Sequence, residues 1–279
     1  MLDDLVTVGD CELYLGDCLD LLPHMGRDSV DLTVTSPPYD DLREYDGAPF
    51  VFAPIPKELY RITKPGGVVV WVTGDKKIKG SESGTSFRHA LAFMQAGFRL
   101  HDTMIYMKAG PSYPSKDTYY QVFEYMFVFS KGKPKTFNPI KDRENRWWGE
   151  KWSKIRTRRQ HNGDLKSQIW YADEGDKIGV RFNIWQYQVG HGYHGDEYCH
   201  KHPASFPEAL AQDHILSWSN PGDLVLDPLM GSGTTGKMAM ITGRRFVGIE
   251  RYTKYFDIAV ERLEAARSQT RLEIREASK

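Results

Sequence analysis

The sequence predicts a doubly wound α/β fold. Short apolar segments rich in β-branched residues alternate along the chain with segments of helical character. One of them, residues 68–72 (Val-Val-Val-Trp-Val), is a continuous apolar run, which is typical of a strand buried on both faces of a parallel sheet. In open sheets of this kind, ligands bind beyond the carboxyl ends of the strands. The loops that follow the strands are therefore where we look for function.

The first half of the chain carries strand and helix patterns in alternation. Residues 11–15 predict a strand, followed by a helix that carries Leu19, Leu21 and Leu22. Residues 28–34 end in β-favouring side chains, and two prolines then stop the strand because they lack the N–H that a ladder needs. Further on, the patterns predict strands over 68–72, 98–107 and 122–129, and helices over 55–63 and 86–96.

The C-terminal part repeats this alternation. A helix is predicted over 208–218, and Asn220-Pro221-Gly222-Asp223 is a strong turn signal. Strands over 224–226 and 246–249 then flank a glycine-rich loop and a helix that contains Lys237 to Ile241. A final helix is predicted over 253–267.

Between residues 135 and 195 the composition changes. Basic residues and tryptophans are interleaved there, although the whole chain has 37 Lys+Arg and 37 Asp+Glu. Such residues can neutralise phosphates and stack on bases, or they can form a solvated helix face over a small core. We predict one catalytic and cofactor-binding α/β domain from residues 1–134 and 196–279, interrupted by an insertion over 135–195.

Other compositional features limit the class of protein. Three cysteines suggest no disulfide framework and fit a reducing compartment. No signal-peptide pattern is visible, and no segment reaches the roughly 20 apolar residues of a membrane helix. We therefore predict a cytoplasmic protein that does not bind a membrane. Histidines cluster near Cys199, but their spacing does not match a zinc site, so no metal is expected.

Two loops at predicted strand ends carry the candidate chemistry. Residues 35–39 (Thr-Ser-Pro-Pro-Tyr) form a proline-stiffened loop with a hydroxyl, carbonyl oxygens and an aromatic ring, although alone it would read as an ordinary turn. Residues 231–236 match G-x-G-x-x-G between a strand and a helix, and Glu250, at the end of the next strand, can accept both hydroxyls of a ribose. Asp227 would repel a phosphate at this loop but attract an ammonium, which favours S-adenosylmethionine over a dinucleotide.

Together the two loops resemble those of the β-class exocyclic-amino (N6-adenine or N4-cytosine) DNA methyltransferases, whose catalytic tetrapeptide is Asp/Asn/Ser-Pro-Pro-Tyr/Phe. Six blocks match this family in order, at residues 16–18, 36–39, 64–67, 202–207, 227–235 and 247–250. The catalytic loop precedes the cofactor loop, as in the permuted β class. The resemblance covers nearly the whole chain except 135–195. It implies a Rossmann-like S-adenosylmethionine-dependent methyltransferase fold with an inserted target-recognition region.

The resemblance also implies which residues form each site. The catalytic loop would consist of Ser36, Pro37, Pro38 and Tyr39. Cofactor binding is implied for Asp17, Cys18, Thr35, His202, Pro203, Ala204, Ser205, Phe206, Asp227, Pro228, Met230, Gly231, Ser232, Gly233, Thr234, Thr235, Glu250 and Arg251. By its position alone Asp17 is a helix cap, whereas the family would place it on the adenine amino group of the cofactor. DNA binding is predicted for Arg43, Tyr45, Arg143, Arg146, Lys151, Lys154, Arg156, Arg158 and Arg159.

The implied activity is methyl transfer from S-adenosylmethionine to the exocyclic amino group of a base flipped out of double-stranded DNA. Ser36 Oγ and the Pro37 carbonyl would accept the amino hydrogens, and Tyr39 would stack on the base. The longer string over 35–45 gives a slight preference for adenine N6, while serine in the tetrapeptide more often accompanies cytosine N4. An RNA or protein amino-methyltransferase shares the chemistry. A NAD-dependent oxidoreductase would explain the glycine loop and Glu250, but not the Ser-Pro-Pro-Tyr loop or the basic insertion. A homodimer is an open alternative, and a restriction partner would be a separate chain.

Overall fold

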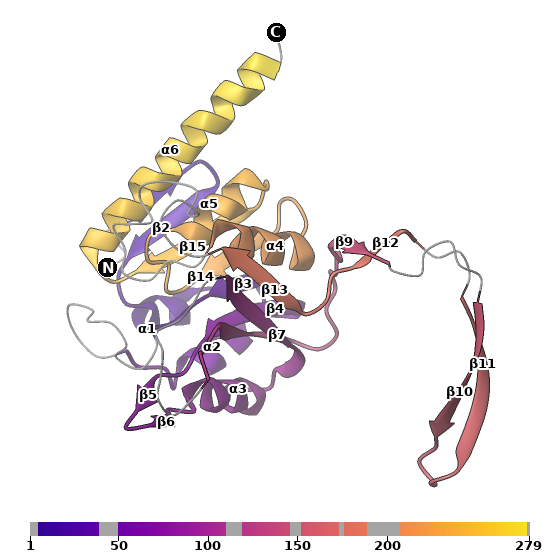
Figure 1. The fold of residues 1–279 in the computed structure, drawn as a ribbon. Coiled ribbons are helices and arrows are strands. Elements are labelled where there is room, and N and C mark those ends of the chain that lie inside the picture. The colour runs from indigo at the N-terminus through magenta and orange to yellow at the C-terminus, as the bar shows by residue number, and fades with distance from the viewer. Residues whose placement is uncertain are drawn as a thin grey trace. The chain divides into compact units, whose positions relative to one another are not determined.

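The computed structural model describes residues 5–38, 50–109, 119–145, 152–172, 176–188 and 207–277. The chain divides into two compact units. The larger unit contains Met1–Asn138 and Asn183–Lys279, and the smaller unit is Pro139–Phe182. Figure 1 labels the helices and strands of both.

The larger unit is built on a nine-stranded sheet in the order β1-β2-β15-β14-β3-β4-β8-β7-β13. Its strands are β1 (Leu5–Val8), β2 (Cys11–Leu15), β3 (Val30–Thr35), β4 (Thr63–Thr73), β7 (Arg99–Ala109), β8 (Phe123–Ser130), β13 (Ile184–Gln188), β14 (Leu224–Asp227) and β15 (Arg245–Glu250). Strands β2, β15, β14, β3 and β4 run parallel to one another. Strands β1 and β8 are antiparallel to their neighbours. The predicted α/β class is confirmed.

Helices cover both faces of this sheet. In Figure 1, α1 (Cys18–Leu21), α2 (Ile55–Ile62) and α3 (Thr85–Gln95) lie on one side, and α4 (Glu208–Trp218), α5 (Thr234–Ile241) and α6 (Thr253–Ala277) lie on the other. A short 3-10 helix, η1 (Leu22–His24), continues α1, and the small strands β5 (Lys77–Ile78) and β6 (Ser81–Glu82) form a hairpin. None of the helices in the described part of the chain combines the length and apolar character needed to cross a membrane.

The core confirms the prediction that residues 68–72 form a strand buried on both faces. Each residue from Val68 to Val72 is at most 1% exposed, because β4 is a central strand with packed side chains on both faces. Trp71 packs against Phe93 of α3 at a ring distance of 5.0 Å, and Phe93 stacks on Phe129 of β8 at 4.5 Å. Burial of each large side chain contributes roughly 1.5–3 kcal/mol. These contacts make the sheet a rigid base for the loops at its edge.

The winding of the sheet reverses between β14 and β3. From β3 the chain passes through α2 to β4 on one side, and from β14 it passes through α5 to β15 on the other side. In doubly wound sheets the ligand site lies in the crevice between the loops of two such strands. Here those loops follow Thr35 and Asp227.

The smaller unit consists of two antiparallel ribbons. Strand β10 (Trp152–Arg159) pairs with β11 (Leu165–Ala172), and β9 (Lys141–Glu144) pairs with β12 (Ile178–Val180). Lys141 and Asp176 form an ion pair at 2.9 Å, and Arg181 pairs with Asp142. The basic residues described here therefore lie on strands and turns, and not on a helix face.

The smaller unit is narrower than the segment 135–195 that composition singles out. Strand β13 falls inside that segment, yet it pairs in parallel with β7 in the large sheet. Trp185 of β13 is buried there against His214 of α4, with ring centroids 4.5 Å apart. Residues 184–188 thus belong to the large sheet, although the predicted insertion extends to residue 195.

Candidate active site at the carboxyl edge of the sheet

The proline loop begins directly after β3. Thr35 is the last residue of the strand, and Ser36, Pro37 and Pro38 follow without regular structure. Pro37 is buried, whereas Ser36 and Pro38 are partly buried. Because neither proline can donate to a ladder, the strand stops here and leaves the loop at the sheet edge. Tyr39 lies outside the described residues.

Hydrogen bonds join this loop to the glycine-rich loop. Thr35 Oγ1 donates to Asp227 Oδ1 at 2.6 Å, and Thr235 Oγ1 donates to the carbonyl of Val34 at 3.2 Å. Strands β3 and β14, which end at Thr35 and Asp227, are parallel neighbours. The two loops predicted to hold base and cofactor therefore share one edge of the sheet, at the point where its winding reverses.

Asp227 is the buried charge at this junction. Its residue is 2% exposed, and burial raises the pKa of its carboxyl to about 6. The hydroxyls of Thr35 and Thr235 and the N–H of Leu229 oppose this rise in pKa, because they bind the charged form. The carboxyl of Asp227 therefore changes its charge close to neutral pH.

Two glycines shape the loop that follows β14. Gly231 (φ +54°) and Gly233 (φ +76°) have left-handed backbones, which favour residues without a side chain. A Cβ on Gly233 would also come within 3.0 Å of Ala259 and Leu263 in α6. Helix α5 already begins at Thr234, so Gly236 lies inside the helix, where a Cβ would meet the ring of Phe246 at 2.6 Å. The third glycine of the motif therefore serves packing between helix and sheet.

Glu250, at the end of β15, holds the same loop. Its Oε2 accepts the N–H of Gly231 and its Oε1 accepts the N–H of Tyr252, both at 2.9 Å. Burial raises the pKa of this carboxyl as well. Each carboxylate oxygen has a second lone pair, which a ribose hydroxyl can use. The position at the second strand end is the one that the glycine motif predicts.

Asp17 follows β2 at the same edge. Its Oδ1 accepts the N–H of Leu19 at 2.9 Å and so caps α1, as its sequence position predicts. Its Oδ2 lies 3.8 Å from Nη1 of Arg251. Cys18 is buried, and burial, together with Asp17, raises the pKa of its thiol to about 12. The thiol stays neutral, and the contact of Asp17 with a cofactor stays a prediction.

Other predicted site residues are placed as follows. Pro228 and Met230 are buried in the loop after β14, and the side chains of Ser232 and Thr234 contact Arg262. Outside the described residues lie Arg43, Tyr45, Arg146, Lys151, His202, Pro203, Ala204, Ser205 and Phe206. Lys154 and Arg156 are described only as strand positions.

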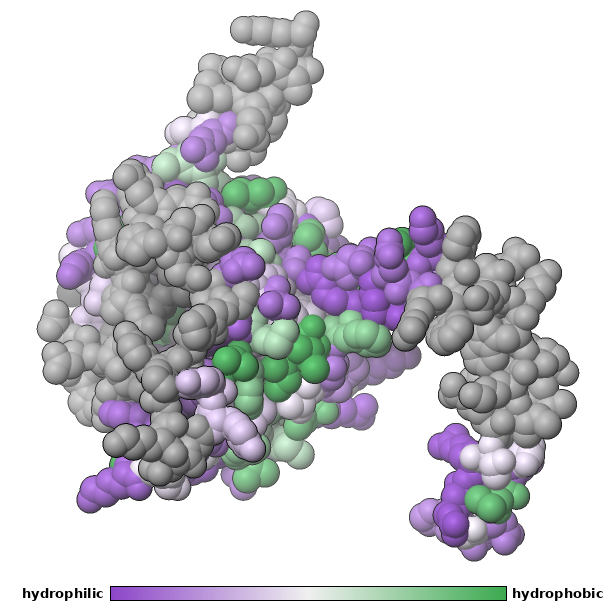
Figure 2. All heavy atoms as spheres, in the orientation of Figure 1, coloured by the Kyte–Doolittle hydropathy of each residue, from purple (hydrophilic) through white to green (hydrophobic). Residues whose placement is uncertain are grey.

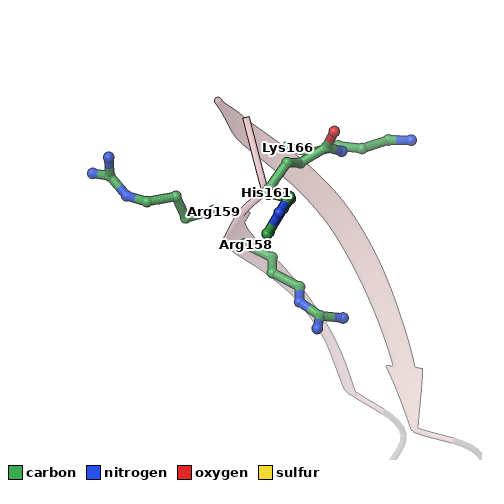
Figure 3. A pocket seen from close by; sticks show the side chains of 5 residues that line it. Arg158, Arg159, His161 and Lys166 are labelled. Atoms are coloured by element: carbon green, nitrogen blue, oxygen red, sulfur yellow. The ribbon is translucent and has the colours of Figure 1, made fainter. Parts of the chain in front are cut away.

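The basic residues of the smaller unit fall into two groups. Arg143 is held within the unit, since its Nε donates to the carbonyl of Val180 at 3.0 Å and its guanidinium lies 4.5 Å from the ring of Phe182. Arg158, Arg159, Gln160, His161 and Lys166 instead line a shallow pocket at the tip of the β10–β11 hairpin (Figure 3). Figure 2 shows a mainly hydrophilic surface on the described part of this tip.

Sequence reasoning missed Arg262 and Glu208, which support the glycine-rich loop from behind. Arg262 lies among the buried residues Ala259, Leu263 and Ala266 of α6. A charged residue at the helical spacing of an apolar face is the signal that could have found it. Its partner Glu208 is the first residue of α4 and gives no comparable signal.

Comparison with known proteins identifies the class of enzyme. The N6 and N4 methylase family, described as DNA methylase, matches residues 30–261. This chain belongs to that family. It is an S-adenosylmethionine-dependent DNA amino-methyltransferase acting on adenine N6 or cytosine N4. The oxidoreductase alternative, which rests on the glycine loop and Glu250, is therefore wrong.

Relatives of this methyltransferase cover most of its length. It is 55% identical over 242 residues to the orphan methyltransferase M.BamHII of Bacillus amyloliquefaciens, spanning 86% of this chain and 91% of that protein. The type II methyltransferase M.BglII of Bacillus subtilis is 27% identical over 261 residues, spanning 90% and 68%.

Solved structures of low identity share the fold. The cytosine-N4-specific PvuII DNA methyltransferase has a TM-score of 0.68 at 20% identity and covers 94% of this chain and 93% of its own. The M1.HpyAVI complex with S-adenosylmethionine has a TM-score of 0.58 at 21% identity and covers 90% and 99%. The Rossmann-like methyltransferase fold predicted from the resemblance is confirmed.

The donor and acceptor chemistry of the sheet edge fits the family's cofactor. Asp17, Asp227 and Glu250 end or follow neighbouring parallel strands, so carboxylates dominate the edge. Hydroxyl and ammonium groups meet hydrogen-bond acceptors there, whereas a phosphate would meet like charges. The left-handed glycines keep the loop backbone free of side chains where a ligand must approach.

Proposed function

We propose that this methyltransferase binds a flipped base of double-stranded DNA between its proline loop and its glycine-rich loop and methylates the exocyclic amino group. The observation that carries the proposal is the Thr35–Asp227 hydrogen bond of 2.6 Å, which joins the two loops where the winding of the sheet reverses. A base held by the first loop would thereby lie next to a cofactor held by the second.

In this proposal the chain orients the amino group and supplies no strong base. The amine of adenine or cytosine is a weak nucleophile, because its lone pair is delocalised into the ring. Acceptors at Ser36 Oγ and the Pro37 carbonyl would bind its two hydrogens and favour the developing positive charge over the flat ground state. When bound, S-adenosylmethionine supplies the electrophilic methyl group. The extra proton of the product is acidic enough to leave to water.

The cofactor would be held by carboxylates at three strand ends. Glu250 would accept ribose hydroxyls, and Asp227 would attract the ammonium of the methionine moiety. Asp17 would accept from the adenine amino group through Oδ2, while its Oδ1 remains the cap of α1. The family resemblance assigns residues 202–206 to the cofactor as well, and these residues precede α4 in the sequence.

Each candidate base is favoured by a different observation. The string over residues 35–45 favours adenine N6, and a part of the chain is 46% identical over 84 residues to the DNA adenine methyltransferase YhdJ of Escherichia coli, which covers 30% of this chain. Ser36 favours cytosine N4, because serine at this position more often accompanies that base in the family. Ser36 lies in the described part of the loop, whereas residues 40–45 do not.

A direct measurement separates the two bases. Plasmid DNA would be incubated with the enzyme and S-adenosylmethionine, digested to nucleosides and analysed by mass spectrometry. N6-methyladenosine or N4-methylcytidine would appear in their deoxy forms, and NAD in place of the methyl donor would give neither. Methylation of RNA with untouched DNA would contradict the proposed substrate.

DNA contact is proposed for the β10–β11 hairpin of the smaller unit. Arg158 and Lys166 are register partners, and alternate residues of a strand share a face, so positions 154 and 156 lie on the same face as Arg158. Arg159 and its partner Leu165 lie on the opposite face, where Leu165 is 65% exposed. Figure 3 shows the side chains of Arg158 and Arg159 extending away from each other. A face with clustered cations is suited to phosphates.

Arg143, another predicted DNA contact, is engaged within the smaller unit. Arg143 already donates to the carbonyl of Val180 and covers Phe182, so its guanidinium stabilises the β9–β12 ribbon. We therefore propose Arg158, with the strand positions of Lys154 and Arg156, as the main contacts to DNA, and a smaller contribution from Arg159 on the opposite face.

A further inference from the structure

We propose that Arg262 of α6 is a positioning residue that holds the glycine-rich loop in the shape required for cofactor binding. The inference rests on the proposed assignment of this loop to the cofactor. Arg262 is 1% exposed, and its guanidinium contacts the residues on both sides of Gly233. It would act through the loop and would not itself touch the cofactor.

The contacts of Arg262 surround the turn at Gly233. Its Nη1 donates to the carbonyl of Ser232 at 3.1 Å and to Thr234 Oγ1 at 2.8 Å, and lies 3.4 Å from Ser232 Oγ. Gly233 itself has a left-handed backbone (φ +76°). Its N–H donates to the carbonyl of Met230 at 3.0 Å and its carbonyl accepts the N–H of Lys237 at 2.9 Å, which closes the turn. Nη1 of Arg262 adds bonds to both flanking residues and so fixes the path of the turn further.

A buried guanidinium needs a counter-charge, and Glu208 provides it. Nη2 of Arg262 donates to Glu208 Oε1 at 2.6 Å, and Lys237 of α5 reaches the same oxygen at 2.7 Å. Charged groups out of water are tolerated only when they are paired and hydrogen-bonded. One carboxylate thus joins the first residue of α4 to α5 and α6, directly beneath the loop.

The location of Glu208 extends the argument to a second cofactor segment. Glu208 follows Pro207 at the start of α4, and the block over 202–207 is one that the family resemblance assigns to the cofactor. A single guanidinium therefore fastens the glycine-rich loop to the beginning of α4. Lysine cannot replace it, because one ammonium lacks the planar fork that reaches a carbonyl, a hydroxyl and a carboxylate together.

The structure offers a matched control in a second buried arginine. Arg244 is 6% exposed and donates to the carbonyl of Ser219 at 2.7 Å and to Ser219 Oγ at 3.1 Å. It also donates to the carbonyl of Thr242, and none of these groups belongs to the glycine-rich loop. Loss of Arg244 should therefore cost stability in the same half of the fold without changing the loop.

The experiment compares Arg262→Lys, Arg262→Met and Arg244→Lys in the full chain. Calorimetric titration with S-adenosylmethionine, without DNA, should show a Kd about tenfold higher or more for both Arg262 variants, and a change within about twofold for Arg244→Lys. Hydrogen exchange should be faster at residues 230–236 in the Arg262 variants and unchanged there in the control. Both Lys variants should have lowered melting temperatures.

Two results would decide against the inference, and a third would decide against the cofactor assignment on which it rests. Wild-type affinity in Arg262→Met, or in Arg262→Lys if the methionine variant does not fold, would overturn it. Equal loss of affinity in Arg244→Lys would show that general destabilisation is responsible. If wild-type protein binds S-adenosylmethionine but Glu250→Ala binds equally well, the assignment of this loop to the cofactor fails instead, and the two failures are thereby distinguished.

Discussion

The carboxyl edge of the large sheet and the tip of the β10–β11 hairpin place charge in opposite ways. At the edge, Asp227 and Glu250 are buried, and each is bound by hydroxyl or N–H donors of neighbouring elements. At the tip, Arg158 and Lys166 are exposed cations on a two-stranded ribbon. Charges at the edge are expensive to bury and depend on one another, whereas charges at the tip are solvated and act nearly independently.

This difference matches the two ligands. A small cofactor needs a preorganised site, because each of its polar groups must find a partner at a fixed place. A polyanion can be met by cations whose contributions add and are screened by salt. Changes at the edge should therefore be large and coupled, and changes at the tip should be small and salt-dependent.

The largest effect is expected from the predicted catalytic tetrapeptide. Tyr39→Ala should lower the methylation rate about a hundredfold or more, because base–aromatic stacking contributes about 1–3 kcal/mol and also orients the base. The Kd for S-adenosylmethionine should stay near the wild-type value. Single-turnover methylation and calorimetry measure the two quantities, and Tyr39→Phe is the matched control that keeps the ring. Parallel loss of both quantities would contradict a stacking role.

The next effect follows from the raised pKa of Asp227. If its charged form attracts the ammonium of the cofactor, affinity should fall about tenfold for each pH unit below a pKa of about 6. The folding stability of the unliganded protein should change with pH in the opposite direction. Because the carboxyl returns to its ordinary pKa of 3.8 in the unfolded chain, the folded state binds the proton more tightly, and this group adds stability as pH falls from about 6 towards 3.8.

Titrations of S-adenosylmethionine between pH 5 and 8 would measure this effect. Asp227→Asn, which keeps the shape of the side chain and removes the charge, should flatten the pH dependence of the affinity. A dependence that persists in this variant would assign the effect to another group, with Glu250 as the first candidate because its pKa is also raised.

The hairpin should give a smaller effect that depends on the face of the ribbon. Arg158→Ala should weaken DNA binding about fivefold and lower the slope of log K against log salt by about 1, as loss of one phosphate contact does. Arg159→Ala removes the same charge from the opposite face and should change both quantities less. Fluorescence anisotropy with a duplex over a salt series measures them. Equal effects of the two substitutions would show that overall charge matters and the face does not.

The last effect concerns folding stability, and not binding, and comes from the bond that joins the two loops. Thr35→Val removes the hydroxyl that donates to Asp227 and should lower the free energy of unfolding by about 1–3 kcal/mol. It should also move the midpoint of the pH dependence upward, because this hydroxyl favours the charged form of Asp227. Thr35→Ser keeps the donor and should shift neither. An unchanged midpoint in Thr35→Val would mean that the bond does not control the charge.

The alternation of elements was predictable from sequence because each strand and helix carries a local signal. The run at Val68–Val72, the prolines after Thr35 and the glycines before α5 each follow from backbone or burial rules that act over a few residues. Strand β13 contains β-favouring residues, but none of them indicates which sheet it joins. Its partner β7 lies about 80 residues earlier in the chain, and its pairing is decided by tertiary contacts.

The candidate site was predictable in its outline only. Spacing and strand ends identify Ser36, Asp227 and Glu250, since a parallel sheet brings its carboxyl ends together. The hydroxyl that opposes the burial-raised pKa of Asp227 belongs to Thr35, which lies 192 residues away in sequence. The contacts of Arg262 are also long-range, because its partners Glu208 and Thr234 come from two other helices. Long-range contacts of this kind leave no local pattern.

The sequence separation of β3 and β14 has a consequence for biosynthesis. At about 5–20 residues per second, a ribosome needs roughly 10–40 s to make the 192 residues between Thr35 and Asp227. During that time β3 has only one of its two sheet neighbours, and its other edge is exposed to pairing with foreign strands. We therefore expect the nascent chain to be most prone to aggregation before β14 is made, and the edge that unites the two loops to form only near the end of synthesis.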